Sequence, residues 1–374
     1  MTDRPTILHV AAVPFTARKL LLPQMQHSAR AGYRVRLACA AEPGGWGADL
    51  APFEPLSLAF PRQLKLGPLA RALVSLPGVL RTVRPDILHL HSPAAALPAR
   101  LIPRSALPKG MKVVYTVHGF AHQWEEAGPR DRVLARVEQA LASRTDLMLF
   151  QSKEDFDESE ARQFATRLRL LGNGVEDEWF GLRPPHPDSS ATVLFVGRLV
   201  REKGVLELLE AVASVPHVRL MLAGAALDTD RDGVEGVVRA RIAQGDLSGR
   251  VEQLGMLSRR ELLQVMGRAG ALVLPSYREG VPRSVIEALA AGRPSVVTDI
   301  RGCRELVRDG VNGFVVAPRS AGSLAQGLRQ LTNLTTAEFT TMSHSARAGV
   351  DPERRESAVF QRLTDAYAEI GVAP

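Results

Sequence analysis

Two glutamates, Glu279 and Glu287, stand eight residues apart in the stretch SYREGVPRSVIEALAAG (276–292). An apolar run ends just before them, and Pro282 is placed to be the first residue of a helix. A helix N-terminus offers free backbone N–H groups and a positive dipole end, which favour phosphate. Carboxylates only accept hydrogen bonds and therefore suit sugar hydroxyls. The pattern predicts two acids on either side of a pyrophosphate, with Glu287 about 7.5 Å beyond Pro282 along the helix axis. A solvated acidic helix face remains the simpler alternative.

Two cations, Arg198 and Lys203, lie in a second candidate stretch, FVGRLVREKG (195–204). This stretch follows one strand-like run and precedes one helical pattern, so both cations are expected at the carboxyl end of a strand. Cations there would stabilise a bound diphosphate and the charge that develops on a leaving nucleotide. Solvated loop cations are the alternative. Taken with the two glutamates, the pair indicates a nucleoside diphosphate sugar as ligand.

The elements that must position these residues alternate along the chain. In the first half, strands are predicted at 6–11, 33–38, 86–91, 112–117 and 146–150, with helices at 66–83 and 132–143. In the second half, strands are predicted at 192–197, 218–224, 270–275, 294–299 and 313–317, with a helix face at Val205, Leu208, Leu209 and Val212. Such alternation is typical of parallel sheets wrapped by helices.

A proline-rich polar stretch at 183–191 separates the two series and reads as a linker. At 374 residues the chain is long for a single core, so two domains are expected. The predicted fold class is α/β: two doubly wound Rossmann-like domains that face each other across a cleft. Ligands in such folds bind beyond the carboxyl ends of the strands.

Composition and charge indicate where the protein acts and what kind of partner it binds. It has only two cysteines, no signal-peptide pattern and no run of about 18 apolar residues, so we expect a cytoplasmic protein that does not span a membrane. The net charge of +7 is uneven, because residues 1–175 contribute +8 and the remainder −1. This asymmetry suggests an anionic partner for the first half, such as phospholipid headgroups, a lipid diphosphate or nucleic acid. A coding bias toward arginine would produce the same excess.

In four places the sequence resembles a known family. GRLVREKG (197–204) and SYREGVPRSVIEALAAGRPSVVT (276–298) resemble the retaining glycosyltransferase family 4, whose fold is called GT-B. TDIRGCRELVRDGVNGFVV (298–316) and TVHGF (116–120) resemble its capsular-polysaccharide and undecaprenyl-diphosphate-linked oligosaccharide transferases. The resemblance spans nearly the whole chain and is strongest over 192–318.

This resemblance implies a role for each matching residue. Arg198 and Lys203 match the family's diphosphate-binding pair, and Glu287 matches the acid that holds the ribose hydroxyls. Glu279 matches the acid that contacts the donor sugar, and His118 matches a first-domain histidine that faces the donor sugar and the reacting centre. The backbone near sugar and phosphate corresponds to Gly280, Val281, Pro282 and Arg283.

The resemblance also implies a mechanism and a domain plan. Such enzymes are retaining and need no metal or other cofactor beyond the nucleotide sugar, expected here to be UDP-linked. The departing phosphate takes the acceptor proton, so no general base is assigned. The implied plan is an acceptor-side domain at 1–175, a nucleotide-sugar-binding domain at 176–352, and a C-terminal helix at about 353–374 that packs back on the first domain.

One departure from the family pattern concerns the loop after the first strand. Where a glycine-rich loop is usual, this chain reads AAVPFTARKLL (11–21). A backbone cradle for the ligand is therefore in doubt there, and Thr16, Arg18 and Lys19 are the candidates for acceptor-side contacts instead.

Three further features have competing interpretations. His89 and His91 share a strand face compatible with metal ligation, but without an evident third ligand a structural or acceptor-side role is favoured. Asn173 is expected to be a turn residue at the domain junction rather than a ligand. The basic, leucine-rich stretch 62–84, which includes Arg62 and Lys65, is either an ordinary surface helix or a docking face for an anionic membrane.

We therefore expect a transferase that moves a sugar from a UDP-sugar to a polysaccharide or lipid-linked glycan of the cell envelope. It would be cytoplasmic, or peripheral at the inner face of the membrane. A UDP-N-acetylglucosamine 2-epimerase of the same fold is the enzymatic alternative. A non-catalytic nucleic-acid-binding protein is the alternative of another class, which the modest charge and the lack of aromatic stacking motifs disfavour.

Overall fold

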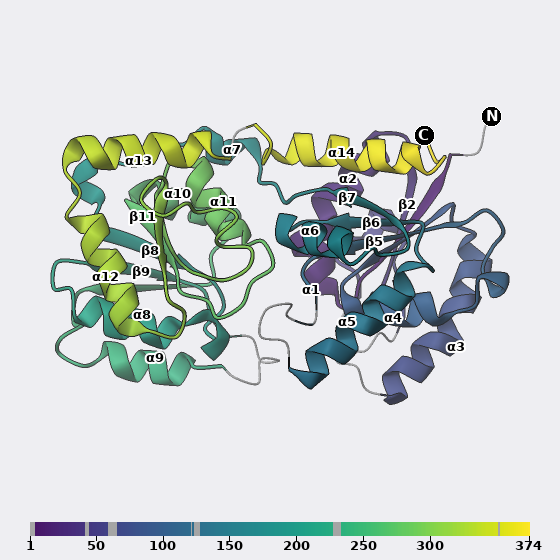
Figure 1. The fold of residues 1–374 in the computed structure, drawn as a ribbon, viewed down its shortest axis with the longest axis horizontal. Coiled ribbons are helices and arrows are strands. Elements are labelled where there is room, and N and C mark those ends of the chain that lie inside the picture. Colours follow the sequence, from purple (N-terminus) through teal and green to yellow (C-terminus); the bar gives the residue numbers. More distant parts are fainter. Residues whose placement is uncertain are drawn as a thin grey trace. The chain divides into compact units, whose positions relative to one another are not determined.

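The structure, a computed structural model, describes residues 4–41, 45–58, 66–120, 122, 128–226, 233–350 and 352–374. It divides into two compact units (Figure 1). Unit 1 comprises Met1–Gly172 together with Phe360–Pro374, and unit 2 comprises Asn173–Val359. Within the described ranges, no helix is both long enough and apolar enough to cross a membrane.

Unit 1 is built on a seven-stranded parallel sheet in the order β3-β2-β1-β4-β5-β6-β7. Its strands are β1 (Thr6–Val10), β2 (Arg34–Cys39), β3 (Leu56–Ser57), β4 (Ile87–His91), β5 (Lys112–Val117), β6 (Leu147–Phe150) and β7 (Arg167–Leu170). Its α-helices are α1 (Pro14–Thr16), α2 (Leu22–Arg30), α3 (Leu66–Val83), α4 (Pro93–Leu101), α5 (Pro129–Ala142) and α6 (Lys153–Ala161), and a π-helical turn (Ala17–Leu21) joins α1 to α2. Short 3₁₀ turns occur at Ala51–Phe53 and Arg104–Ala106.

Unit 2 is built on a six-stranded parallel sheet in the order β10-β9-β8-β11-β12-β13. Its strands are β8 (Thr192–Val196), β9 (Arg219–Ala223), β10 (Val251–Gly255), β11 (Ala271–Leu274), β12 (Ser295–Thr298) and β13 (Gly313–Val316). Its helices are α7 (Asp177–Phe180), α8 (Val205–Ala213), α9 (Glu235–Ile242), α10 (Arg259–Arg268), α11 (Arg283–Ala290), α12 (Ala321–Thr332) and α13 (Thr336–Ala348), with 3₁₀ turns at Pro187–Ser189 and Arg201–Lys203. Helix α14 (Glu356–Glu369) begins in unit 2 and ends in unit 1.

The predicted α/β class with two parallel, Rossmann-like sheets is confirmed. Every strand predicted from an apolar run is present, and the central ones are buried along their length, as β4 and β11 show. The sequence did not predict β3, β7 and β10. All three lie at sheet edges. Polar residues occupy much of β7 and β10, so no apolar run marks them.

Two local expectations differ from the structure. Helix α11 begins at Arg283, one residue later than predicted, because Pro282 has an extended ψ of 116° and acts as the N-cap. The proline-rich stretch 183–191 lies inside unit 2, and the chain passes between the units at Gly172–Asn173 and again at Val359–Phe360. Residues 183–191 are anchored to the unit 2 sheet by close packing, since a Cβ on Gly270 would lie 2.1 Å from the Ser189 carbonyl oxygen.

Candidate functional site

The loop after β8 is held against the end of β11 in unit 2. Arg198 lies exposed two residues beyond β8, and Lys203 ends the 3₁₀ turn that follows. Gly204 comes next with φ +67°, and a Cβ there would lie 2.1 Å from the carbonyl oxygen of Pro275. Only glycine allows the backbone to approach this closely in a left-handed conformation. The contact therefore places Lys203 beside the loop that carries Glu279.

Lys203 and Glu279 form an ion pair at this position. Lys203 Nζ donates to Glu279 Oε1 at 2.5 Å, and both side chains are largely buried, with 20% and 12% of their surface exposed. Ser276 Oγ donates to the same oxygen at 2.7 Å. Thr298, at the end of β12, donates to the Ser276 carbonyl oxygen and fixes this residue in turn. The carboxylate of Glu279 is thus held in one orientation by Lys203 and Ser276, and the end of β12 holds Ser276 in turn.

Helix α11 begins immediately after this carboxylate. The carbonyl of Pro282 accepts the N–H groups of Val285 and Ile286, which leaves the N–H groups of the first turn unused by the helix. The Val281 carbonyl accepts a hydrogen bond of 3.0 Å from Asn173 Nδ2. The expected turn is absent at Asn173, which lies in an irregular segment, and its side chain ties the start of unit 2 to the segment before α11.

Carboxylates surround Arg283, the first residue of α11. Its guanidinium lies 3.0 Å from Glu176, 3.7 Å from Glu356 and 3.9 Å from Glu287, in each case measured between nitrogen and oxygen atoms. Arg259 also contacts Glu176. Burial, and then repulsion from Glu176, raises the pKa of Glu356 to about 7. Glu287, one turn into the helix, is thus part of a network of acids around arginine.

The structure therefore brings most of the predicted donor-side residues of unit 2 onto two adjoining segments. Lys203 and Glu279 are in direct contact, and Arg283 and Glu287 pair along α11. Gly280 lies against the loop after β12, because a Cβ on Gly302 would meet the Gly280 carbonyl oxygen.

In unit 1, His118 follows the last residue of β5 and is half buried. Its Nδ1 is 3.1 Å from Gln151 Oε1, and its Nε2 is 3.1 Å from Nδ1 of His91. Burial lowers the pKa of His118 to about 4, so the ring is neutral near pH 7.

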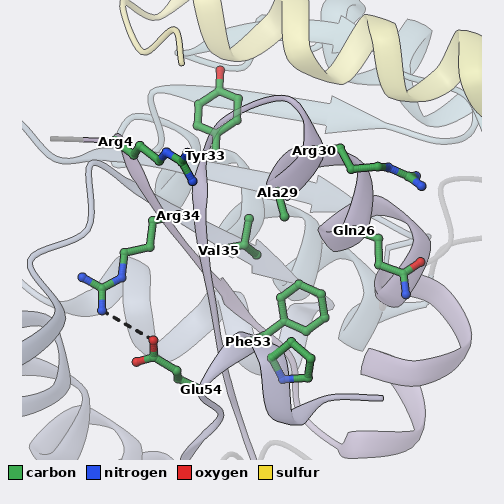
Figure 2. A pocket seen from close by; sticks show the side chains of 10 residues that line it. Arg4, Gln26, Ala29, Arg30, Tyr33, Arg34, Val35, Phe53 and Glu54 are labelled. Atoms are coloured by element: carbon green, nitrogen blue, oxygen red, sulfur yellow. Dashed lines mark ion pairs between the residues drawn. The ribbon is translucent and has the colours of Figure 1, made fainter. Parts of the chain in front are cut away.

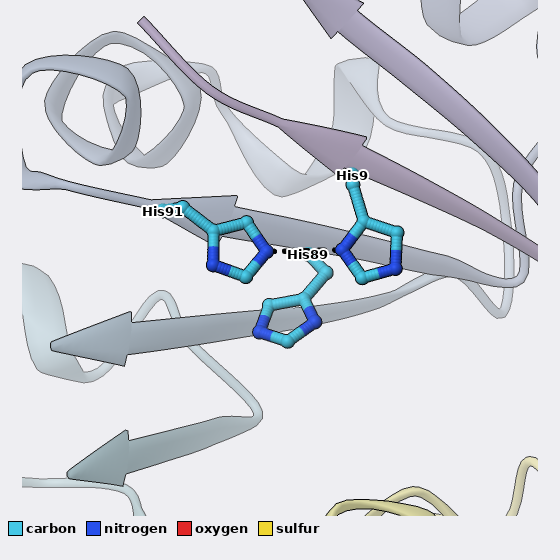
Figure 3. Close-up of side chains that lie close together, drawn as sticks. All are labelled: His9, His89 and His91. Atoms are coloured by element: carbon cyan, nitrogen blue, oxygen red, sulfur yellow. Dashed lines mark hydrogen bonds between the residues drawn. The ribbon is translucent and has the colours of Figure 1, made fainter. Parts of the chain in front are cut away.

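Three fully buried histidines lie together, as Figure 3 shows, and one of them, His91, is the histidine bonded to His118. His9 on β1 joins His89 and His91 on β4, and one ring nitrogen from each lies within 4.8 Å of the others. A metal bound through His9 Nδ1 or His91 Nε2 would have to replace the 3.0 Å hydrogen bond that joins these two nitrogens. Both nitrogens of His89 already have partners, in Thr116 Oγ1 and the Tyr367 hydroxyl. The hydrogen bonds thus account for the cluster without an ion.

The proposed acceptor-side residues lie on the first helical segment of unit 1. Thr16 ends α1, and Arg18 and Lys19 belong to the π-helical turn. Arg18 Nε donates to Asp49 Oδ2 at 2.7 Å, and Lys19 is exposed. Arg62 and Lys65 of the basic stretch lie outside the described residues, but Arg71, Arg81 and Arg84 belong to or follow α3.

An open hollow lies in unit 1, at the end of the sheet away from the candidate site residues (Figure 2). It is lined by Arg4, Gln26, Ala29, Arg30, Tyr33, Arg34, Val35, Pro52, Phe53 and Glu54. Arg4 precedes β1 and Arg34 begins β2, so the hollow is at the amino ends of the strands. Ligands of doubly wound folds bind beyond the carboxyl ends of the strands. The hollow is therefore not part of the candidate site.

Sequence reasoning missed three residues of the site. Ser276 could have been proposed from the sequence, because it precedes Glu279 by only three residues, and the loop between them brings the two side chains together. His9 was harder to recognise as a site residue, because the sequence shows only a histidine one residue before the end of a strand. It becomes the third member of the cluster only through the pairing of His9 with His89 across β1 and β4. Gln151 gave no signal.

Two family models cover most of the chain. The model described as Glycosyltransferase Family 4 matches residues 24–179, and the model described as Glycosyl transferases group 1 matches residues 183–346. A glycogen synthase of Mycobacterium tuberculosis (strain H37Rv) is 30% identical over 298 residues, which are 78% of this chain and 67% of that protein. The chain belongs to glycosyltransferase family 4. It is also 29% identical over 354 residues to the putative glycosyltransferase EpsD of Bacillus subtilis (strain 168), with 87% of each chain covered.

Comparison with solved structures supports the GT-B fold of this family 4 chain. HepE of Anabaena, solved in complex with UDP-glucose, has a TM-score of 0.75 at 22% sequence identity, and the match covers 97% of this chain and 99% of HepE. Family membership makes the protein a glycosyltransferase. The epimerase and the nucleic-acid-binding alternatives are therefore set aside.

Proposed function

We propose that this glycosyltransferase is a retaining enzyme that transfers a sugar from a UDP-sugar to a polysaccharide or lipid-linked glycan. The observation that carries the proposal is the ion pair of Lys203 and Glu279 at the strand ends of unit 2, beside the start of α11. These groups match the parts of a nucleotide sugar. The cation and the unused backbone N–H groups suit the phosphates, and the fixed carboxylate suits a sugar hydroxyl.

Each residue has a distinct role in this proposal. Lys203 and Arg198 neutralise the diphosphate, Glu279 accepts hydrogen bonds from the transferred sugar, and Glu287 accepts them from the ribose. The backbone of Gly280, Val281, Pro282 and Arg283 lines the position of sugar and phosphate. His118 of unit 1 contacts the donor sugar.

The chemistry follows from these roles. The two cations stabilise the charge that grows on the leaving diphosphate, which is the task a metal performs in other transferases. The acceptor hydroxyl attacks the same face of the sugar that the diphosphate leaves, and the departing phosphate oxygen takes its proton. Glu279 is already bound by Lys203 and Ser276, an arrangement suited to orientation rather than to proton abstraction.

Relatives support the two substrate classes. HepE is solved with UDP-glucose, which favours a uridine nucleotide as donor. The glycogen synthase, by its name, makes glycogen, which is a polysaccharide. The charge of +8 over residues 1–175 suits an acceptor carried on an anionic lipid, so we place the reaction at the inner face of the membrane.

A thermal-shift screen over UDP-, GDP- and ADP-sugars tests the donor site. A UDP-sugar should raise the melting temperature of the wild type, because a ligand that binds only the folded state stabilises it. Arg198→Ala and Glu287→Ala should lose most of that shift. Arg239→Ala and Glu252→Ala, which alter exposed residues elsewhere on unit 2, should keep it. If no nucleotide sugar stabilises the wild type, or all four variants respond alike, the donor-site assignment is wrong.

Product analysis tests the reaction itself. NMR of the transferred sugar should show the anomeric configuration of the donor, as retention requires, and excess EDTA should leave the rate unchanged. An inverted product, or activity restored only by a divalent cation, would contradict the proposed mechanism.

A further inference from the structure

A row of hydrogen-bonded imidazoles crosses the carboxyl end of the unit 1 sheet. His9 Nδ1 is 3.0 Å from His91 Nε2, His91 Nδ1 is 3.1 Å from His118 Nε2, and His118 Nδ1 is 3.1 Å from Gln151 Oε1. These residues lie in or directly after β1, β4, β5 and β6, which are neighbours in the sheet in that order. Figure 3 shows the buried part of the row, with His9 and His91 joined.

The row has one favoured direction. A neutral imidazole carries one N–H and one lone pair. Because Gln151 offers its carbonyl oxygen, His118 donates through Nδ1, and its Nε2 must accept. His91 therefore donates through Nδ1 to His118, and for the same reason His9 donates through Nδ1 to His91. The last nitrogen, His9 Nε2, is buried without a partner and carries a lone pair. In the opposite direction it would carry an N–H without an acceptor, which is the rarer and costlier state of a buried group.

We propose that His91, held in turn by His9, is a positioning residue that makes His118 a hydrogen-bond donor through Nδ1. An oxygen of the donor sugar would take that N–H in place of Gln151 Oε1. The lone pair of His118 stays occupied by the His91 N–H, so His118 cannot accept a proton while the row is intact. This inference rests on the proposed function only in naming the sugar as the acceptor of the hydrogen bond.

The surroundings keep the row neutral. Burial lowers the pKa of His9 to about 3 and that of His118 to about 4, and burial together with the neighbouring imidazoles lowers those of His89 and His91 well below the usual value. Among the described residues, the other titratable group that hydrogen-bonds to these rings is Tyr367 of α14, whose hydroxyl bonds to His89. Within the described ranges, no Asp or Glu hydrogen-bonds to any of the four rings.

NMR of protein with ¹⁵N-labelled histidine tests the direction without any substrate. In the wild type, the His118 signals should report a proton on Nδ1 and should not change between pH 5.5 and 8. His91→Phe removes the donor to His118 Nε2, so His118 should populate both tautomers and begin to titrate in this range. His91→Gln can still donate through its amide and should restore the wild-type tautomer.

His89→Phe is the matched control. His89 is on the same strand and equally buried, but it bonds to Thr116 and Tyr367 and not to His118. It should lower the melting temperature as His91→Phe does while leaving the His118 signals and kcat/KM within twofold of the wild type. His91→Phe should lower kcat/KM by about fivefold, the effect of one lost hydrogen bond, mainly through kcat.

Three results would overturn the inference. One is a proton on Nε2 of His118 in the wild type. Another is an unchanged His118 tautomer in His91→Phe. The third is a stoichiometric transition metal in the purified protein by elemental analysis, which would make the histidines ligands. The NMR measurement needs no nucleotide sugar. It therefore tests the role of His91 even if the proposed transferase function is wrong.

Discussion

At the residue scale, the candidate site depends on how Glu279 is held. Lys203 and Ser276 both bind Oε1, and among the described residues no hydrogen bond or ion pair is made to Oε2. The second oxygen thus has its acceptor capacity available for a ligand hydroxyl. Because hydrogen bonds to an ionised acceptor are stronger than neutral ones, the two bonds to Oε1 should fix the direction of Oε2.

We predict that Ser276→Ala lowers kcat/KM by about tenfold or more, because a hydrogen bond to a charged group contributes about 1.5–3 kcal/mol and each step of about 1.4 kcal/mol is tenfold. Steady-state kinetics with a UDP-sugar measures the effect. Tyr277→Phe is the control from the same loop, since it removes a hydrogen bond to Glu207 and not to Glu279. An equal loss in both variants would mean that the order of the loop, and not the orientation of Glu279, determines the rate.

At the element scale, the loops after the strands of unit 2 fit together through their backbones. Gly302, in the loop after β12, has φ +80°, and a Cβ there would overlap the carbonyl oxygen of Gly280. The contact holds the segment between Glu279 and α11 in place. It depends on glycine twice, for the left-handed backbone and for the space.

Gly302→Ala should therefore destabilise the protein by about 2 kcal/mol or more, from backbone strain and from displacement of the Gly280 segment. It should also weaken UDP-sugar binding. Gly322→Ala in α12 is the control, because a Cβ there has no neighbour within 4 Å, and this variant should be as stable as the wild type or slightly more stable. Urea unfolding monitored by circular dichroism distinguishes the two. A neutral Gly302→Ala would contradict the tight contact.

Burial determines which strands and site residues could be predicted from the sequence. Buried central strands have apolar runs that a single sequence displays, and the positions of Lys203 and Glu279 at strand ends followed from those runs. Edge strands such as β10 lack the run and were missed. The row of histidines depends on the register of β1 against β4, which pairs His9 with His89 across 80 residues of sequence. No local pattern encodes such a pairing.

At the scale of the whole molecule, the two units should respond to pH in opposite ways. In unit 1, His9 and His118 have pKa values lowered to about 3 and about 4 by burial. The unfolded chain takes up protons at these histidines below about pH 6.5, so their contribution to stability is lost as the pH falls. In unit 2, Glu356 has a pKa raised to about 7. The folded state then binds the proton more tightly, and the contribution of Glu356 is lost as the pH rises.

Glu356→Gln isolates the second effect. Between about pH 4.5 and 7 the folded protein keeps a proton that the unfolded chain has released, so the free energy of unfolding falls across this window and levels off above it. Burial is the main cause, followed by the charge of Glu176, and Arg283 and Arg259 only partly offset them. The melting temperature of the wild type should therefore drop relative to Glu356→Gln as the pH rises from 5 to 8. Glu252→Gln, at an exposed carboxyl of β10, should run parallel to the wild type. A constant difference between wild type and Glu356→Gln over this range would show that Glu356 titrates alike in the folded and unfolded states.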